Sequence, residues 1–119
     1  MITTHFLISA LKTRYCLTSD YSVSQLLEVT KNSAYGWKNH NIALGDPTAR
    51  KVADLLDADV SVIYAAMQAE RSNDPISKAI WLGIYAKLGG QQVYENIKKS
   101  CTEKKAITAK VSPLPRLIP

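Results

Sequence analysis

Residues 18–38 read TSDYSVSQLLEVTKNSAYGWK, and this stretch decides the fold. It has cap-forming side chains at residues 18–20 and again at Thr30, and each is followed by apolar residues at helical spacing. We therefore predict two short helices, from about Tyr21 to Glu28 and from just after Thr30 to about Asn39, joined by a tight turn. Their apolar residues are spaced so that the two helices bury the angle between them. These residues are Val23, Leu27, Val29, Ala34 and Trp37.

The opposite face of the second helix has the composition of a DNA-binding surface. If Ala34 and Trp37 point inward, steps of about 100° per residue leave that face polar, aromatic and basic. No acidic residue lies between Glu28 and Asp46, so a phosphate backbone would meet no repulsion there. The amide of Asn32 is suited to reading adenine in the major groove. The predicted DNA-binding residues are Thr30, Lys31, Asn32, Ser33, Tyr35, Gly36, Lys38 and Asn39.

Two positions in this helix also have a structural interpretation. An aromatic residue at helical spacing is usually part of the core, so we expect Trp37 to anchor the helix from the inside. Gly36 costs about 1 kcal/mol relative to alanine inside a helix, and it offers no side chain to a base. Two explanations for Gly36 stay open: it lets the backbone approach DNA closely, or it is a tolerated neutral substitution.

The run from Leu17 to Lys38 resembles the helix-turn-helix of phage repressor and Cro proteins. Over residues 6–81, including ADLL at 53–56 and AAMQAER at 65–71, the chain is similar to a small phage-related family of filamentous phages and prophages. This resemblance implies a lambda-repressor-like fold, a compact bundle of four or five helices. It also implies that the third helix is the recognition helix and that a homodimer presents it to DNA.

Two positions depart from the usual pattern of such proteins. The turn between the two helices commonly has glycine where this chain has Glu28, and the first of the two helices usually has alanine where this chain has Ser24. Glycine relieves a left-handed backbone conformation. Glu28 therefore implies either some strain or a slightly different turn.

The rest of the chain also shows helical periodicity, and strand patterns are nearly absent. We therefore predict an all-α protein, a compact bundle of five to six helices with a flexible C-terminal tail. Besides the two helices above, we predict a helix from about Thr4 to Tyr15 and one from Pro47 onward with Asp46 as its cap. A further helix runs from Val62 to about Arg71 with Ser61 as its cap, and another from Ile76 to about Leu88. A weaker helix is predicted over Gln91–Lys99.

This pattern divides the chain into three segments. Residues 1–72 are the predicted helix-turn-helix DNA-binding domain, residues 73–102 a C-terminal helical extension, and residues 103–119 a flexible basic and proline-containing tail. An apolar arc on the extension is broad enough to cover the core and also to meet a second chain, so this segment is a candidate dimerisation region and we expect a homodimer. The arc consists of a row, Ile76, Ile80, Ile84 and Leu88, widened by Trp81, Leu82 and Tyr85.

Composition excludes several other classes of protein. No apolar run approaches the roughly 20 residues that span a bilayer, and no signal peptide is recognisable, so we expect a cytoplasmic protein without a membrane partner. There is no glycine-rich phosphate loop, no pair of metal ligands and no nucleophile beside a base. We therefore predict neither an enzyme nor a cofactor. The net charge of +5 is weak evidence for a DNA surface, because residues 91–119 hold six basic residues against two acidic ones.

Together these features predict a sequence-specific transcriptional regulator of the phage or prophage repressor type, whose partner is double-stranded operator DNA of pseudo-palindromic sequence. The alternative is a protein-interaction module, such as an antitoxin or an anti-repressor. In the tail, the run Pro113-Leu114-Pro115-Arg116 resembles a proline-rich docking peptide for a protein partner. An unstructured end is the simpler interpretation of that segment.

Overall fold

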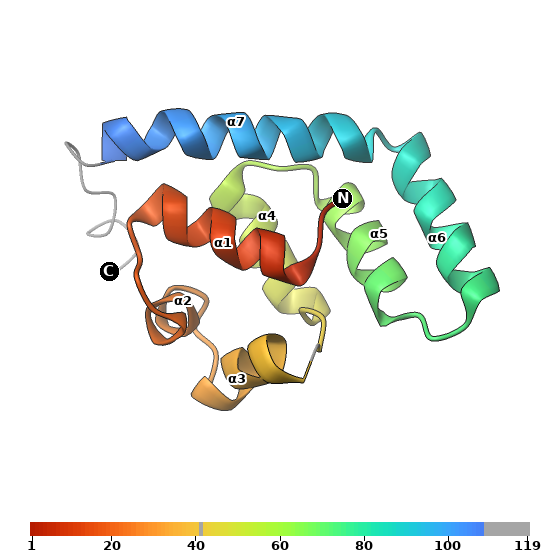
Figure 1. The fold of residues 1–119 in the computed structure, drawn as a ribbon, viewed down its shortest axis with the longest axis horizontal. Coiled ribbons are helices and arrows are strands. Elements are labelled where there is room, and N and C mark those ends of the chain that lie inside the picture. The colour runs from red at the N-terminus through yellow and green to blue at the C-terminus, as the bar shows by residue number, and fades with distance from the viewer. Residues whose placement is uncertain (41, 109–119) are drawn as a thin grey trace.

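The predicted helices are all present in the computed structural model, which describes residues 1–40 and 42–108. Within these residues all regular structure is α-helical, as predicted, and there are seven helices instead of five to six. They are α1 (Thr4–Tyr15), α2 (Asp20–Leu26), α3 (Lys31–Asn39), α4 (Asp46–Leu56), α5 (Val60–Arg71), α6 (Pro75–Lys87) and α7 (Gly90–Thr108) (Figure 1).

Side-chain caps fix where most of these helices begin. In each case a side-chain oxygen accepts a hydrogen bond from a backbone N–H of the first turn, which typically stabilises a helix by about 1 kcal/mol. The capping residues are Thr3, Ser19, Thr30, Asp59 and Asp74. The predicted cap at Thr30 is therefore confirmed.

Two of the predicted caps are wrong by one or two residues. Asp46 is the first residue of α4, and the cap is Gly45, which has no side chain to offer. The Asp46 carboxylate instead lies 3.3 Å from Nη2 of Arg71 at the end of α5. Asp59 caps α5 in place of Ser61, because its carboxylate accepts a hydrogen bond from the Ser61 N–H at 2.8 Å.

α7 is much longer than the weak helix predicted over residues 91–99. It runs along α1 (Figure 1), and its Ile97 side chain is buried. The helix continues to Thr108 and so includes the first residues of the segment 103–119 that the sequence predicts as a tail. Residues 109–119, which include the proline-rich motif of the predicted tail, lie outside the described residues.

The core lies around α1, which sits between α7 on one side and the pair α2 and α3 on the other (Figure 1). The Phe6 ring of α1 packs on the Tyr94 ring of α7, with 4.6 Å between ring centroids. Val52, Ala53 and Leu56 of α4 are also buried, and so are Ile63, Ala66 and Met67 of α5. The largest fully buried side chains include Ile2, Leu7, Leu11, Leu27, Leu44, Ile63 and Met67.

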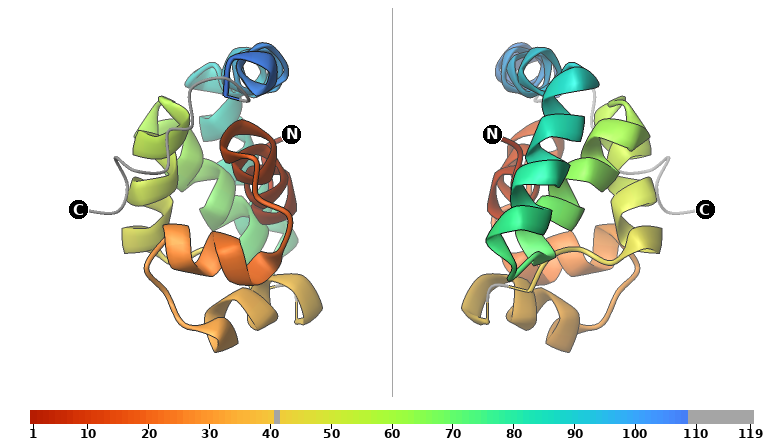
Figure 2. Two further views of the ribbon diagram at one scale, coloured as in Figure 1. Left: turned by 90° about the vertical axis from the view of Figure 1, so that its left-hand side faces the viewer. Right: turned by 90° about the vertical axis from the view of Figure 1, so that its right-hand side faces the viewer.

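The apolar arc predicted on α6 is divided between the core and the surface. Tyr85 is buried, and Trp81 and Leu82 are half-buried, on the side of α6 that faces the rest of the molecule. α6 lies on the outside of α5 (Figure 2), and the row predicted on its other side is exposed. The core therefore uses only one side of the arc.

Candidate nucleic-acid interface

α2 and α3 lie together at the end of the molecule opposite α7 (Figure 2). α2 follows Ser19, whose Oγ accepts a hydrogen bond from the Ser22 N–H at 3.1 Å. α3 follows Thr30, whose Oγ1 accepts one from the Ser33 N–H at 3.2 Å. Because both helices are capped and only residues 27–30 separate them, the direction of α3 relative to α2 is fixed by a short turn.

The turn between α2 and α3 contains a left-handed residue. Glu28 has φ 58°, the conformation that glycine usually supplies at a helix C-terminus, so the strain inferred from the sequence is present. The Val29 N–H donates to the Ser24 C=O at 2.9 Å and closes the end of α2. The carboxylate of Glu28 forms an ion pair with Lys51 of α4, and the hydrogen bond from Lys51 lowers the pKa of Glu28. The turn is thereby tied to the body of the protein.

The inner faces of α2 and α3 meet as predicted. Trp37 is only 6% exposed, which confirms it as the core anchor of α3. Ser24, at the position where alanine is usual, is also buried, and its Oγ donates to the Tyr21 C=O at 2.6 Å. Of the residues predicted to fill the angle between the two helices, Val29 is half-buried and the others are buried: Val23, Leu27, Ala34 and Trp37.

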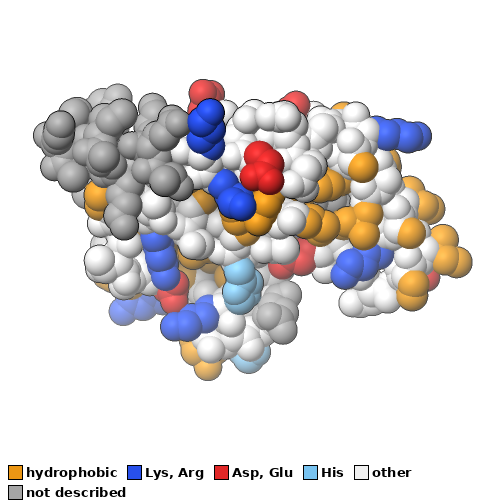
Figure 3. Space-filling view, turned by 45° about the horizontal axis from the view of Figure 1, so that its top comes forward, with side chains coloured by type: hydrophobic (Ala, Val, Ile, Leu, Met, Phe, Trp, Pro, Cys, Tyr) orange, Lys and Arg blue, Asp and Glu red, His pale blue; other side chains and the backbone are white. Residues whose placement is uncertain are grey.

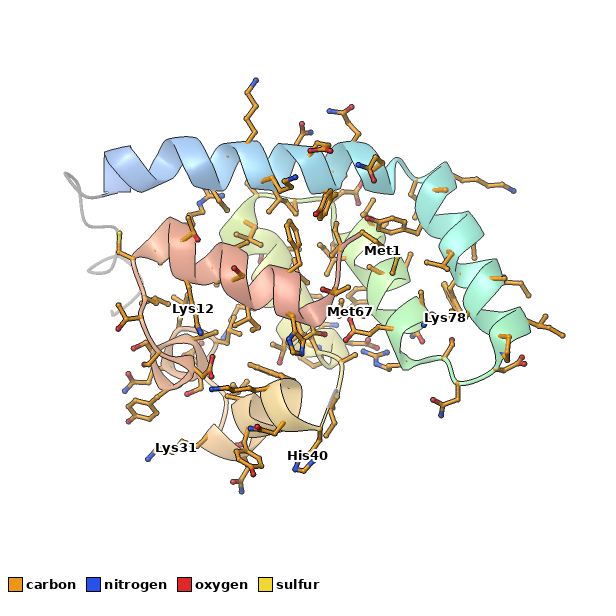
Figure 4. All side chains as sticks on the ribbon, viewed as in Figure 1. Met1, Lys12, Lys31, His40, Met67 and Lys78 are labelled. Atoms are coloured by element: carbon orange, nitrogen blue, oxygen red, sulfur yellow. The ribbon has the colours of Figure 1, made fainter. Side chains whose placement is uncertain are left out.

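The outer face of α3 is polar and open to solvent. All but one of the predicted DNA-binding residues are exposed there or at the cap that precedes it. Lys31 and His40 mark the two ends of this face, on the side of α3 away from α1 (Figure 4). The exposed members of the predicted set are Thr30, Lys31, Asn32, Ser33, Tyr35, Lys38 and Asn39.

Several contacts order the side chains of this face. The Tyr35 ring meets the His40 ring edge-on, with 5.3 Å between centroids, and the Asn39 amide nitrogen lies 3.2 Å from the Tyr35 carbonyl oxygen. Lys31 Nζ lies 4.8 Å from the centre of the Tyr21 ring. Sequence reasoning left Tyr21 and His40 out of the site, although an aromatic residue in the first turn of α2 was a usable signal for Tyr21.

Gly36 is the one predicted site residue that is not on the outer face, and its predicted exposure is wrong. The chain after α3 folds back over it, so that the N–H groups of His40 and Ile42 donate to the Gly36 C=O at 3.0 and 3.2 Å. A Cβ atom at position 36 would lie 3.0 Å from Cδ1 of Ile42. Gly36 therefore makes room for Ile42 and does not offer its backbone to a ligand on the outer face.

The fold also brings an acidic residue to this end of the molecule. One oxygen of Asp20, in the first turn of α2, lies 2.7 Å from Lys12 Nζ in α1, and the other lies 3.3 Å from Lys38 Nζ in α3. The hydrogen bond from Lys12 is the largest cause that lowers the pKa of Asp20. Because the Lys38 side chain remains 67% exposed, a phosphate is able to compete with Asp20 for it.

The described part of the chain contains no cluster of three side chains able to hold a metal ion. None of its helices is long and apolar enough to cross a membrane. Comparison of the chain with models of known families, with curated proteins and with solved structures finds no match.

Proposed function

We propose that this protein is a sequence-specific transcriptional regulator that binds duplex DNA through a helix-turn-helix formed by α2 and α3, with α3 in the major groove. The observation that carries the proposal is the outer face of α3, where the exposed side chains are polar, aromatic or basic and none is acidic. The major groove of B-DNA admits one α-helix. A short capped helix at one end of the molecule suits that groove.

Five of the exposed side chains have a role in this arrangement. Asn32 has the bidentate geometry for N6 and N7 of adenine, and Ser33 and Tyr35 are placed for a base edge or a phosphate. Lys31 and Lys38 neutralise phosphates on either side of the groove. The first turn of α3 has no acidic side chain, so its backbone N–H groups add a favourable field for a phosphate.

The regulatory setting rests on the resemblance of residues 17–38 to phage repressor and Cro proteins. It favours the control of phage or prophage genes at an operator close to the protein's own gene. The competing function is that of an interaction module, an antitoxin or an anti-repressor, which would contact a protein instead of DNA.

The experiment that tests the proposal is fluorescence anisotropy with labelled duplexes from the region beside the protein's own gene, in excess unrelated DNA. We expect a competitor-resistant complex that the double variant K31A/N32A weakens by about 30-fold or more, because it loses one base contact and one phosphate contact. The dependence of log affinity on log salt should also fall by about 1.

A matched control removes the same two side-chain types from another part of the surface. Asn73, just before α6, and Lys78 in the first turns of α6 are both exposed. Lys78 lies away from α3 (Figure 4), so N73A/K78A should leave the affinity unchanged. A complex that survives K31A/N32A would overturn the placement of α3. Absence of any competitor-resistant complex with the wild-type protein would instead favour the interaction module.

A further inference from the structure

The outer side of α6 carries an exposed apolar row. The side chains of this α6 row, Ile76, Ile80, Ile84 and Leu88, are 71%, 58%, 36% and 43% exposed. Hydrophobic side chains gather on the surface at the α6 end of the molecule, at the right of Figure 3. Large apolar side chains aligned in this way along a helix mark a contact surface, since isolated exposed residues show no such order.

We propose that the α6 row is the contact between two copies of this chain, with their α6 helices packed antiparallel about a two-fold axis. The side chains of the row recur every four residues, so the row has the same spacing when read in either direction along the helix. Two antiparallel copies can therefore place apolar side chains opposite each other. With the axis between Ile80 and Ile84, Ile80 of one chain lies opposite the partner's Ile84. At the ends, Ile76 lies opposite the partner's Leu88. Ridges spaced four residues apart interdigitate in this kind of packing.

The charges at the two ends of α6 favour the antiparallel arrangement. Asp74 caps the start of α6, and the exposed Lys87 stands in its last turn, between Ile84 and Leu88 along the row. An antiparallel pair brings Asp74 within about one helical turn of the partner's Lys87. It also sets the two helix dipoles antiparallel, so that each helix N-terminus lies beside the partner's C-terminus. A parallel pair would bring the two Lys87 ammonium groups together instead.

Gly83 is a second observation on the same face of α6. Glycine is among the least favourable residues inside a helix. A Cβ atom at position 83 would meet nothing within 4 Å, so no packing among the described residues requires a glycine there. Close approach of a second helix accounts for it.

The dimer has a consequence that rests on the proposed function. α6 runs between the α3 end of the molecule and the α7 end (Figure 1), so a two-fold axis perpendicular to α6 turns the partner's α3 toward the opposite end. The two recognition helices then face away from each other. Such a dimer joins two separate duplex segments, whereas the adjacent half-sites of the pseudo-palindromic operator expected from the sequence would need parallel α6 helices.

The interface is tested without DNA, by sedimentation equilibrium of the full chain at micromolar concentration. We expect particles of twice 13.1 kDa. The single variants I80K and I84E should each weaken self-association by about tenfold or more, because each places a charge against an apolar side chain. V60K is the control, since Val60 at the start of α5 is an exposed apolar residue outside the α6 row, 41% exposed, and this change should leave the dimer intact. Circular dichroism of each variant checks that the helices are retained.

Mixing the two weakened variants tests the arrangement of the helices. In an antiparallel pair the lysine of I80K meets the glutamate of I84E, so an equimolar mixture should regain the dimer. In a parallel pair each introduced charge faces isoleucine, so the mixture should stay dissociated. Monomeric wild-type protein, dimers that survive both substitutions, or a mixture that does not recover would each overturn the proposal.

The role toward DNA is measured separately, by energy transfer between two duplexes that carry different dyes. Wild-type protein should bring the two duplexes together, and I80K should bind each one singly with unchanged affinity but fail to join them. Loss of single-duplex binding in I80K would contradict the separation of the α6 row from the DNA surface. If wild-type protein bound no DNA at all, the proposed function would fail while the sedimentation result still decided the dimer.

Discussion

Lys38 in α3 lies 3.3 Å from the carboxylate of Asp20 at the start of α2. The same carboxylate binds Lys12 of α1 through its other oxygen, at 2.7 Å. One side chain thus links three helices at the end of the molecule where we propose that DNA binds. A charge that is lost in acid therefore contributes to the contact of α3 with α1 and α2.

The first prediction concerns this carboxylate and the acid sensitivity of the fold. The folded pKa of Asp20 lies below its ordinary value of 3.8, chiefly through the hydrogen bond from Lys12. Its contribution to stability is therefore complete above pH 3.8 and is lost as the pH falls through the folded pKa. At neutral pH, D20N should lower the unfolding free energy by at most about 1 kcal/mol, because the ion pairs of Asp20 are partly exposed. In strong acid the substitution should have no effect, because the Asp20 carboxylate is then protonated in the wild type as well.

Urea unfolding at a series of pH values measures this difference. The control is D54N, which removes an exposed carboxylate on α4 without touching the ion pairs of Asp20. If the difference in unfolding free energy between D20N and the wild type stayed constant down to strong acid, the ion pairs of Asp20 would not be the cause of the stabilisation.

The second prediction concerns the left-handed turn at Glu28. Since φ is 58° there, E28G should relieve backbone strain and raise Tm by about 2–5 °C, even though it removes the exposed ion pair with Lys51. E28A should lower Tm, because alanine keeps the strained conformation and also loses the pair. Thermal unfolding followed by circular dichroism compares the two. A lower Tm for E28G than for the wild type would mean that the ion pair outweighs the strain.

The sequence was sufficient to predict the orientation of α3, because the spacing of Ala34 and Trp37 fixes the inner face of a single helix. It was not sufficient for Gly36. The angular position of Gly36 on the α3 wheel is outward, but Ile42 from the following segment folds over it. A helical wheel describes one helix and contains no information about the chain that returns across it.

Helix ends and distant ion pairs escaped prediction for related reasons. Asp59 and Ser61 are both good caps, and the choice between them depends on which first turn packs against the core. The length of α7 depends on its docking along α1, where Ile97 is buried. Asp20 is linked to Lys12 and Lys38 only after three separate helices have packed together. Each of these features is decided by tertiary contacts, which local sequence patterns do not contain.

The third prediction concerns the junction between α6 and α7. A Cβ atom at Gly90 would lie 2.4 Å from ring carbons of the buried Tyr85, so G90A must displace that ring. The Tyr85 hydroxyl accepts a hydrogen bond from the Ile2 N–H at 3.1 Å and donates one to the Gly90 C=O at 3.2 Å. Displacement of the ring breaks both, so G90A should cost about 2 kcal/mol or more of unfolding free energy.

Two further variants separate the steric effect from the loss of hydrogen bonds. Y85F keeps the ring in place but leaves the Ile2 N–H without its acceptor, and it should cost about 1–3 kcal/mol. The control G45A adds a Cβ atom that meets only Cδ of Pro47 at 4.0 Å, so it should cost less than about 1 kcal/mol. If urea unfolding gave the same midpoint for G90A and G45A, the close contact between Gly90 and Tyr85 would not constrain the junction.

The fourth prediction concerns the two thiols, which lie in opposite environments. Cys16 is exposed at the end of α1, whereas Cys101 of α7 is buried and its Sγ–H donates to the Ala10 C=O at 3.5 Å. Burial raises the pKa of Cys101, so its reactive thiolate is scarce in the folded protein. Titration with a disulfide reagent should therefore show one fast thiol, absent in C16S, and a second that reacts only in denaturant. Equal rates for the two would mean that the buried Cys101 thiol becomes exposed within the time of labelling.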